Sequence, residues 1–176
     1  MLSKRSENYG NNYHHDKISL NRSKRNHLIH SLFLREEDDL CLTIIEHQIK
    51  DTHNHCQYPL YIKGLILRKK GQLKDSLSYF QQINNFNPSS ISNMKEMAKS
   101  YYLLGSHQLA LNYYNKLSSM TEDWEVEYSK ALCLLHLNQY DEAIEAFLLA
   151  NAIQRQDQTF IQLGILYTFL SQYDDA

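Results

Sequence analysis

Hydrophobic and small residues recur along the chain with helical spacing, and the pattern repeats about every 34 residues. One row of small residues is spaced 34, 33 and 33 positions apart, at Gly64, Ala98, Ala131 and Gly164. A second row follows it twelve positions later in every case, at Ser76, Ala110, Ala143 and Ala176. Such self-similarity is typical of proteins built from stacked repeats, so the chain is predicted to be a repeat array.

Three further rows lie in phase with the small residues. Aromatic residues follow the second row by four positions, at Phe80, Tyr114 and Phe147, and the apolar residues three positions later are Ile83, Leu117 and Ala150. Between the two small rows lie residues that favour turns, at Gly71, Gly105, Asn138 and Ser171. Each unit is therefore predicted to be a helical hairpin whose helices cross closely at small residues and turn at a left-handed residue. One hairpin cannot bury its apolar face alone, so the units must stack.

These rows resemble the tetratricopeptide repeat, and the segment KALCLLHLNQYDEAIEAFLLA within 124–156 carries the resemblance most clearly. The resemblance implies an all-α, helical-hairpin solenoid with a right-handed superhelical twist. Complete repeats are expected at 57–90, 91–123 and 124–156, after a degenerate first hairpin at 26–56 whose turn would hold the acidic run Glu36–Asp39. The last unit, 157–176, ends within its second helix. We therefore expect a truncated piece of a longer array with apolar surface exposed at its C-terminal end.

Composition agrees with long helices and short connections. The chain has 176 residues but only 5 Gly and 2 Pro, well below the average usage of about 12% for the two together. Turn-rich β folds need these residues, so they are disfavoured. The net charge is −2, too weak to suggest a nucleic-acid binder. Residues 1–25 are nevertheless basic, with six Lys or Arg against two acidic residues, and are expected to be a disordered arm.

Residues with catalytic or metal-binding chemistry do not assemble into a recognisable set. The three cysteines, Cys41, Cys56 and Cys133, are widely spaced, which favours a reducing compartment over a disulfide framework. Cys133 lies on an apolar face and is interpreted as a core residue. The cluster His53, His55 and Cys56 lacks a second cluster at zinc spacing and is interpreted as a surface connection. Glu142 and Glu145 are expected to be solvated, and no catalytic residue, cofactor or metal is predicted.

The resemblance to tetratricopeptide arrays implies a concave groove lined by the first helix of each hairpin. The residues at its second, fifth, ninth and twelfth positions that are predicted to bind a partner are Tyr58, Tyr61, Arg68, Lys95, Lys99, Tyr102 and Tyr128. Tyrosine combines apolar area with a polar tip, which suits a protein contact. Alternatively, several of these side chains pack against the neighbouring unit. The pairs Tyr61/Leu65 and Lys95/Lys99 do not match the Lys–Asn pair of co-chaperone arrays, so a chaperone-adaptor role is disfavoured.

Residues 26–176 also resemble the tetratricopeptide subunits among the Bardet–Biedl syndrome proteins, which build the BBSome ciliary cargo coat. The likeness is carried by LIHSLFLREEDDLC, YIKGLILRKKGQLKDSLSYFQ, AKSYYLLGSHQLALNYYNKL and DWEVEYSKALCLLHLNQYDEA. It implies a non-catalytic scaffold with BBSome subunits, centriolar-satellite proteins or dynactin-type adaptors as partners, located in the cytoplasm, at the centrosome and basal body, and in the cilium. Membrane contact would be peripheral and made through the complex.

Two other functions stay open at the level of sequence. The chain could be a tetratricopeptide scaffold of another assembly, such as a cell-cycle ligase. It could also be the substrate-recruiting part of a larger enzyme.

Overall fold

The computed structural model describes residues 22–52 and 56–174, where all regular secondary structure is α-helical. The first described helix runs over 22–34. It is followed by α2 (Asp38–Thr52), α3 (Gln57–Lys69), α4 (Leu73–Phe86), α5 (Ile91–Leu103), α6 (His107–Ser118), α7 (Trp124–His136), α8 (Tyr140–Ile153) and α9 (Asp157–Asp174). None of these helices is long and apolar enough to cross a membrane.

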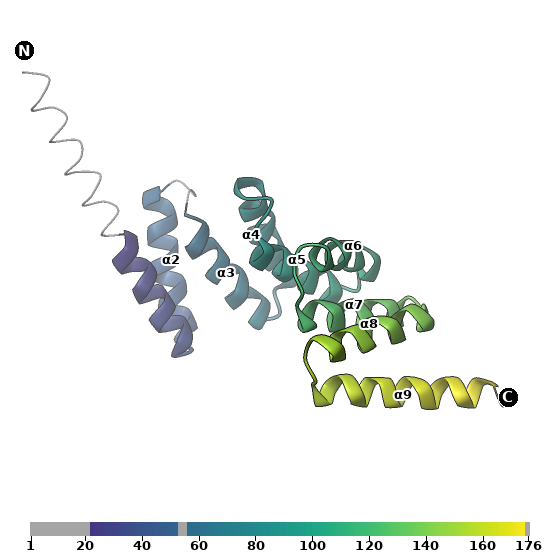
Figure 1. Cartoon of the computed structure of the whole chain (residues 1–176). Helices are drawn as coiled ribbons and strands as arrows, with labels where there is room; N and C mark the ends of the chain where they lie inside the picture. The colour runs from purple at the N-terminus through teal and green to yellow at the C-terminus, as the bar shows by residue number, and fades with distance from the viewer. Residues whose placement is uncertain (1–21, 53–55, 175–176) are drawn as a thin grey trace, which may run out of the picture.

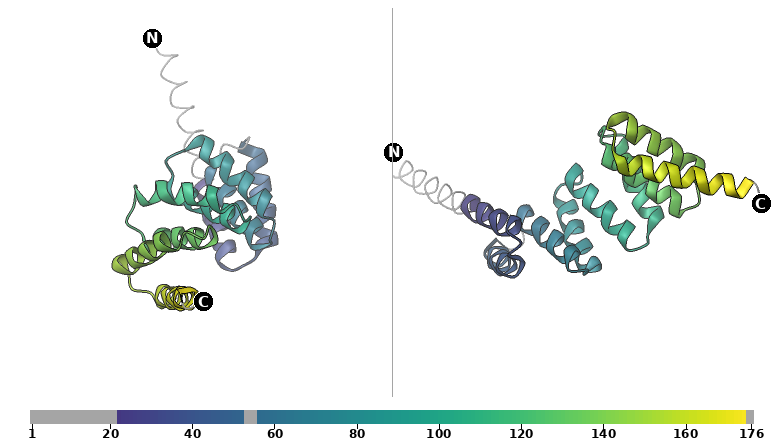
Figure 2. Two further views of the ribbon diagram at one scale, coloured as in Figure 1. Left: turned by 90° about the vertical axis from the view of Figure 1, so that its right-hand side faces the viewer. Right: turned by 90° about the horizontal axis from the view of Figure 1, so that it is seen from below.

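The helices pack mainly on their neighbours in chain order. The pairs α3–α4, α5–α6 and α7–α8 form hairpins, and α4–α5, α6–α7 and α8–α9 contacts stack one hairpin on the next. Figure 1 shows this progression from the helix at 22–34 to α9, and Figure 2 shows α9 beside α8 at the end of the stack. The all-helical solenoid predicted from the repeats is confirmed.

Small residues allow the helices of a hairpin to approach closely. Gly64 on α3 faces Phe80 on α4 so tightly that a Cβ atom at residue 64 would lie 2.7 Å from the ring. The Ser76 hydroxyl donates a hydrogen bond of 2.8 Å to the Gly64 carbonyl. The other small residues between α3 and α8 are also fully buried: Ala98, Ala110, Ala131 and Ala143. The predicted role of both small rows is confirmed in these three hairpins.

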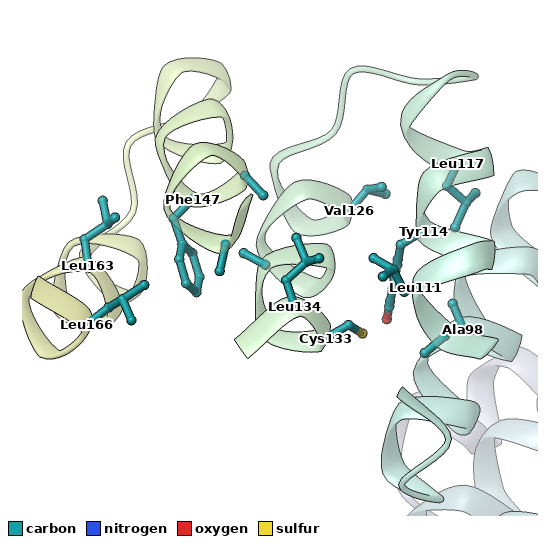
Figure 3. Packing of buried hydrophobic residues seen from close by; sticks show 14 of the residues in the cluster. Ala98, Leu111, Tyr114, Leu117, Val126, Cys133, Leu134, Phe147, Leu163 and Leu166 are labelled. Atoms are coloured by element: carbon teal, nitrogen blue, oxygen red, sulfur yellow. The ribbon is translucent and has the colours of Figure 1, made fainter. Parts of the chain in front are cut away.

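The aromatic row fills the interior that these crossings leave. Phe80 and Phe147 have no exposed surface, and Tyr114 is 5% exposed. Figure 3 shows Tyr114 on α6 and Phe147 on α8 within one apolar cluster, whose members lie between Met94 and Leu166. Cys133 lies in this cluster with no exposed surface, and burial raises the pKa of its thiol to about 12. Its predicted core role is confirmed.

Three of the four predicted turns have the expected left-handed residue. The φ angles are 79° at Gly71, 76° at Gly105 and 60° at Asn138. The prediction at Ser171 is wrong, because α9 continues through it to Asp174. Serine has no special tolerance for positive φ, and here its hydroxyl donates to the Thr168 carbonyl at 3.0 Å, which is compatible with a continuing helix.

The prediction of a close helix crossing at Gly164 is also wrong. Gly164 is exposed, and a Cβ atom there would meet nothing within 4 Å. Because α9 continues as a single helix through Ser171, no second helix crosses it at this point. The predicted apolar surface at this end is present, with Ile161 and Ile165 each 59% exposed. Ala176 lies outside the described residues.

The first two described helices form a pair held by local contacts. Ile29 and Leu32 pack with Cys41 and Ile45 of α2 in one apolar cluster. Glu36 turns the chain with a φ of 59°. The helix at 22–34 includes four residues that the sequence assigned to a disordered arm. Arg25 forms an ion pair of 2.6 Å with Asp51 of α2, which helps to hold that end in place. The rest of the arm, 1–21, lies outside the described residues.

Candidate protein-binding groove

A pocket of about 340 Å³ lies between α5 and α7. Its α5 wall comes from residues three to four positions apart, which share one helix face; these are Lys95, Lys99, Tyr102 and Leu103, joined by Glu96. Its α7 wall has the same spacing in Trp124, Glu125, Tyr128 and Leu132. Gln158 of α9 closes one side, and Tyr114 of α6 also reaches the pocket. The sequence-predicted residues Lys95, Lys99, Tyr102 and Tyr128 therefore line one site.

The two lysines of this pocket differ in electrostatic environment. Lys95 forms an ion pair with Asp123, the N-cap residue of α7, whose carboxylate also accepts from the Glu125 backbone N–H at 2.9 Å. Burial acts to raise the pKa of Asp123, but the hydrogen bonds from Lys95 and the backbone outweigh it and hold this pKa below its ordinary value. Lys95 is therefore largely neutralised within the chain.

Lys99 is the available positive charge. Its side chain is exposed, and no carboxylate among the described residues pairs with it. Aromatic side chains line the same pocket, where the Trp124 and Tyr128 rings lie 6.2 Å apart and Tyr128 packs edge-on against Phe147 at 5.6 Å. A cation beside rigid aromatic rings suits a ligand with a carboxylate and an apolar side chain.

Tyr102 connects the pocket to a pair of histidines. Its hydroxyl lies 2.9 Å from His136 Nε2, and the His136 ring stacks on His107 at 4.3 Å. Burial, and secondarily the nearby His136, lower the pKa of His107 below its ordinary value. The contact between Tyr102 and His136 joins α5 to α7 beside the pocket.

The predicted residues on α3 make contacts within the chain and lie outside this pocket. Arg68 forms an ion pair with Glu96 and also donates to its backbone carbonyl at 3.3 Å. Tyr61 donates to the Glu96 carboxylate at 3.5 Å and packs on Phe80. The Tyr58 hydroxyl lies 2.8 Å from His30 Nδ1. These three side chains therefore contact neighbouring units of the array, which is the alternative that the sequence left open.

Metal-binding chemistry is not apparent in the described part of the chain. No group of three or more His, Cys, Asp or Glu side chains within residues 22–52 and 56–174 could hold a metal ion. The interpretation as a surface connection is wrong for Cys56, which is buried at the start of α3, whereas His53 and His55 lie outside the described residues.

Comparison with known proteins gives the same fold. A tetratricopeptide-repeat family model matches residues 128–157. Among solved structures, MamA 41-end from Desulfovibrio magneticus RS-1 superposes with a TM-score of 0.77 at 15% identity, covering 86% of each chain. A tetratricopeptide repeat protein from Parabacteroides merdae superposes with a TM-score of 0.76 at 19% identity, over 86% of this chain and 61% of that one.

Relatives found by sequence identify the family to which the chain is related. The BBSome complex member BBS4 from Bos taurus is 32% identical over 154 residues, which is 87% of this chain. The Xenopus tropicalis protein of the same name is 36% identical over 142 residues, or 80% of this chain. The chain is a homologue of BBS4. It spans about 30% of the length of these BBS4 proteins, and the resemblance noted in its sequence is confirmed.

Several pocket residues of this BBS4 homologue were not singled out in the sequence. Glu96 lies next to Lys95 and anchors Arg68, and Trp124 supplies an aromatic wall. Trp124 could have been found from the sequence, because it lies four residues before Tyr128 and therefore on the same helix face. No pattern in the sequence connects Asp123 to Lys95, which lies 28 positions earlier.

Proposed function

We propose that this chain is a protein-interaction scaffold that takes part in a BBSome-type assembly and serves ciliary membrane-protein trafficking and cilium assembly. Support comes from the BBS4 relatives, whose name describes them as members of that complex, and from the tetratricopeptide fold. The proposed partners are BBSome subunits and centriolar-satellite or dynactin-type adaptors. The corresponding locations are the centrosome, the basal body and the cilium.

The observation that carries a binding role for this region is the pocket between α5 and α7. It is lined by Lys99, for which no ion pair is found within the described residues, and by Tyr102, Trp124 and Tyr128. We assign it to a protein segment that presents a carboxylate next to an aromatic or aliphatic side chain, because these groups match the charge and the apolar walls. Tyr58, Tyr61 and Arg68 contact neighbouring helices of the chain, and we assign them a smaller part in binding the partner.

Affinity purification of the tagged chain from ciliated cells tests this proposal. Wild-type chain should recover BBSome subunits, and Lys99→Glu should lower that recovery several-fold, since it reverses the charge in the pocket. Lys74→Glu, which changes an exposed lysine on α4, is the matched control and should recover as much as wild type. Recovery of no BBSome subunit by the wild-type chain would contradict membership of the assembly. Equal recovery by wild type and Lys99→Glu would contradict the role of the pocket.

A further inference from the structure

A second groove lies on a different surface, between α6 and α8, with α7 as its floor. It comprises two adjoining hollows of about 460 and 560 Å³ that share Leu149. Figure 1 shows α7 between α6 and α8, and both of these helices contact α7. Along α6 the groove follows one helix face through Gln108, Leu111, Asn115 and Ser118. Along α8 it follows Glu142, Glu145, Ala146, Leu149, Ala152 and Ile153.

The groove has an apolar centre and an acidic rim. Leu134 of α7 lies at its floor and Leu111 lines it from α6, while Leu149 and Ile153 are 47% and 37% exposed along α8. Four carboxylates line it, from Glu122, Glu127, Glu142 and Glu145, against a single ammonium group, that of Lys130. An acidic surface repels nucleic acids and anionic membranes. Charge complementarity therefore selects a basic protein segment.

Glu127 is the most informative of these carboxylates because it occupies a core position of the repeat. The equivalent residues in the two preceding repeats are Leu60 and Met94, each four positions before a small residue of the first row. All three are buried, with exposures of 0% at Leu60, 1% at Met94 and 3% at Glu127. A carboxylate at a position that otherwise holds Leu or Met is unfavourable unless it gains partners.

The partners available within the described residues leave Glu127 incompletely satisfied. The Ser118 hydroxyl donates to Glu127 Oε1. Glu127 Oε2 accepts no hydrogen bond from the described residues, and Lys130 Nζ lies 3.5 Å away. Because this oxygen is enclosed and forms an ion pair with Lys130, Glu127 adds negative charge beside the groove, and the carboxylates exposed to a partner include Glu142 and Glu145.

The complete acidic rim is a property of this groove and not of the repeat, although Glu142 has an acidic equivalent in Asp75 two repeats earlier. One repeat earlier, the residues equivalent to Glu127, Glu142 and Glu145 are Met94, Leu109 and Asn112, and the equivalent of Leu149 is Lys116. The same helix geometry thus carries no acidic rim in the preceding unit. Packing of the repeats does not require these carboxylates.

We infer that the groove between α6 and α8 binds a basic amphipathic helix of a partner protein, with apolar side chains on Leu149 and Ile153 and Lys or Arg side chains at Glu142 and Glu145. Helix α8 has 14 residues, so the groove is about 20 Å long and matches a helix of three to four turns. An amphipathic helix laid in a groove is an established mode of peptide recognition. The inference is independent of the pocket at Lys99.

Fluorescence anisotropy of the intact chain tests the inference. The probe is a labelled, stapled helix of about 16 residues with Leu on one face and Lys on the other. The wild-type chain should bind it in a salt-dependent manner, whereas a matched peptide with Glu in place of Lys should not bind. The double variant Glu142→Gln and Glu145→Gln should weaken binding roughly tenfold. Asp75→Asn, at the position of α4 equivalent to Glu142, and Lys99→Glu should leave it unchanged.

Glu127→Met separates a binding role from a packing role. It restores the residue type of the preceding repeat, so the midpoint of thermal unfolding should be unchanged or higher while binding weakens. If this variant fails to fold, the double variant carries the test. Amide shifts in an NMR titration should map to α6 and α8. Equal binding of the Lys and Glu peptides, full affinity in the double variant, or shifts confined to the pocket between α5 and α7 would each overturn the inference.

Discussion

Gly64 and Phe80 meet where α3 crosses α4, and a Cβ atom on residue 64 would lie 2.7 Å from the Phe80 ring. The ring has nowhere to move, because it has no exposed surface and is packed by Tyr61 and by Arg68, whose guanidinium carbon lies 5.7 Å from its centroid. Hydrogen bonding from Ser76 to the Gly64 carbonyl fixes the crossing further. The size of residue 64 therefore sets the distance between the two helices.

Gly64→Ala should destabilise the chain by about 1–2 kcal/mol, since overpacking at the crossing outweighs the higher helix propensity of alanine. Gly164→Ala is the control at the equivalent repeat position. Its Cβ would meet nothing within 4 Å, so the gain in propensity should stabilise the chain by up to about 1 kcal/mol. Urea unfolding of both variants measures this. Equal effects of the two substitutions would contradict the described difference between the crossings.

Ala143→Leu should destabilise the chain by roughly 1–3 kcal/mol, because Ala143 is fully buried where α8 packs against α7. Ala152→Leu, on an exposed position of the same helix, should change the free energy of unfolding by less than about 0.5 kcal/mol. Thermal unfolding followed by circular dichroism compares the two. An unchanged midpoint in Ala143→Leu would mean that the repeat register is misplaced.

Glu96→Gln should destabilise the chain by about 1–3 kcal/mol, since it leaves the Arg68 side chain, which is 13% exposed, without its carboxylate partner. The Tyr61 hydroxyl also loses the charged carboxylate to which it donates a hydrogen bond. Removal of that carboxylate should lower the pKa of Tyr61, which burial and secondarily Glu96 raise to about 12 in the wild type. Spectrophotometric titration of tyrosine together with urea unfolding tests both effects. Glu125→Gln, an exposed carboxylate in the same pocket, is the control.

The stability of the chain should depend on pH through His107. Its pKa is lowered in the folded chain, so the unfolded chain binds more protons between that value and the ordinary value of about 6.5. The contribution of His107 is therefore complete above about pH 6.5 and is lost as pH falls toward the lowered pKa. His107→Gln should show a smaller difference in melting midpoint between pH 7.5 and 5.5 than the wild type. An identical difference in both proteins would contradict this assignment.

The sequence by itself determined the repeated architecture. Small residues spaced 33 or 34 positions apart, aromatic residues four after the second row, and Gly or Asn at the turns predicted the crossings, the core and three of the four turns. These features depend on local spacing and on steric limits that hold for any chain, such as the positive φ of Gly71. The four pocket residues Lys95, Lys99, Tyr102 and Tyr128 were expected from the groove positions that the resemblance to tetratricopeptide arrays implies.

Only the tertiary structure decided which charges are available for binding. Lys95 and Lys99 lie one helical turn apart, but the first pairs with Asp123 and the second has no partner among the described residues. Glu127 likewise lies on α7 as an ordinary acidic residue until folding buries it in a core position beside a groove. The reason is physical: periodicity places a side chain on a helix face, but the charge that meets it comes from another helix. Which charge that is depends on how the hairpins stack.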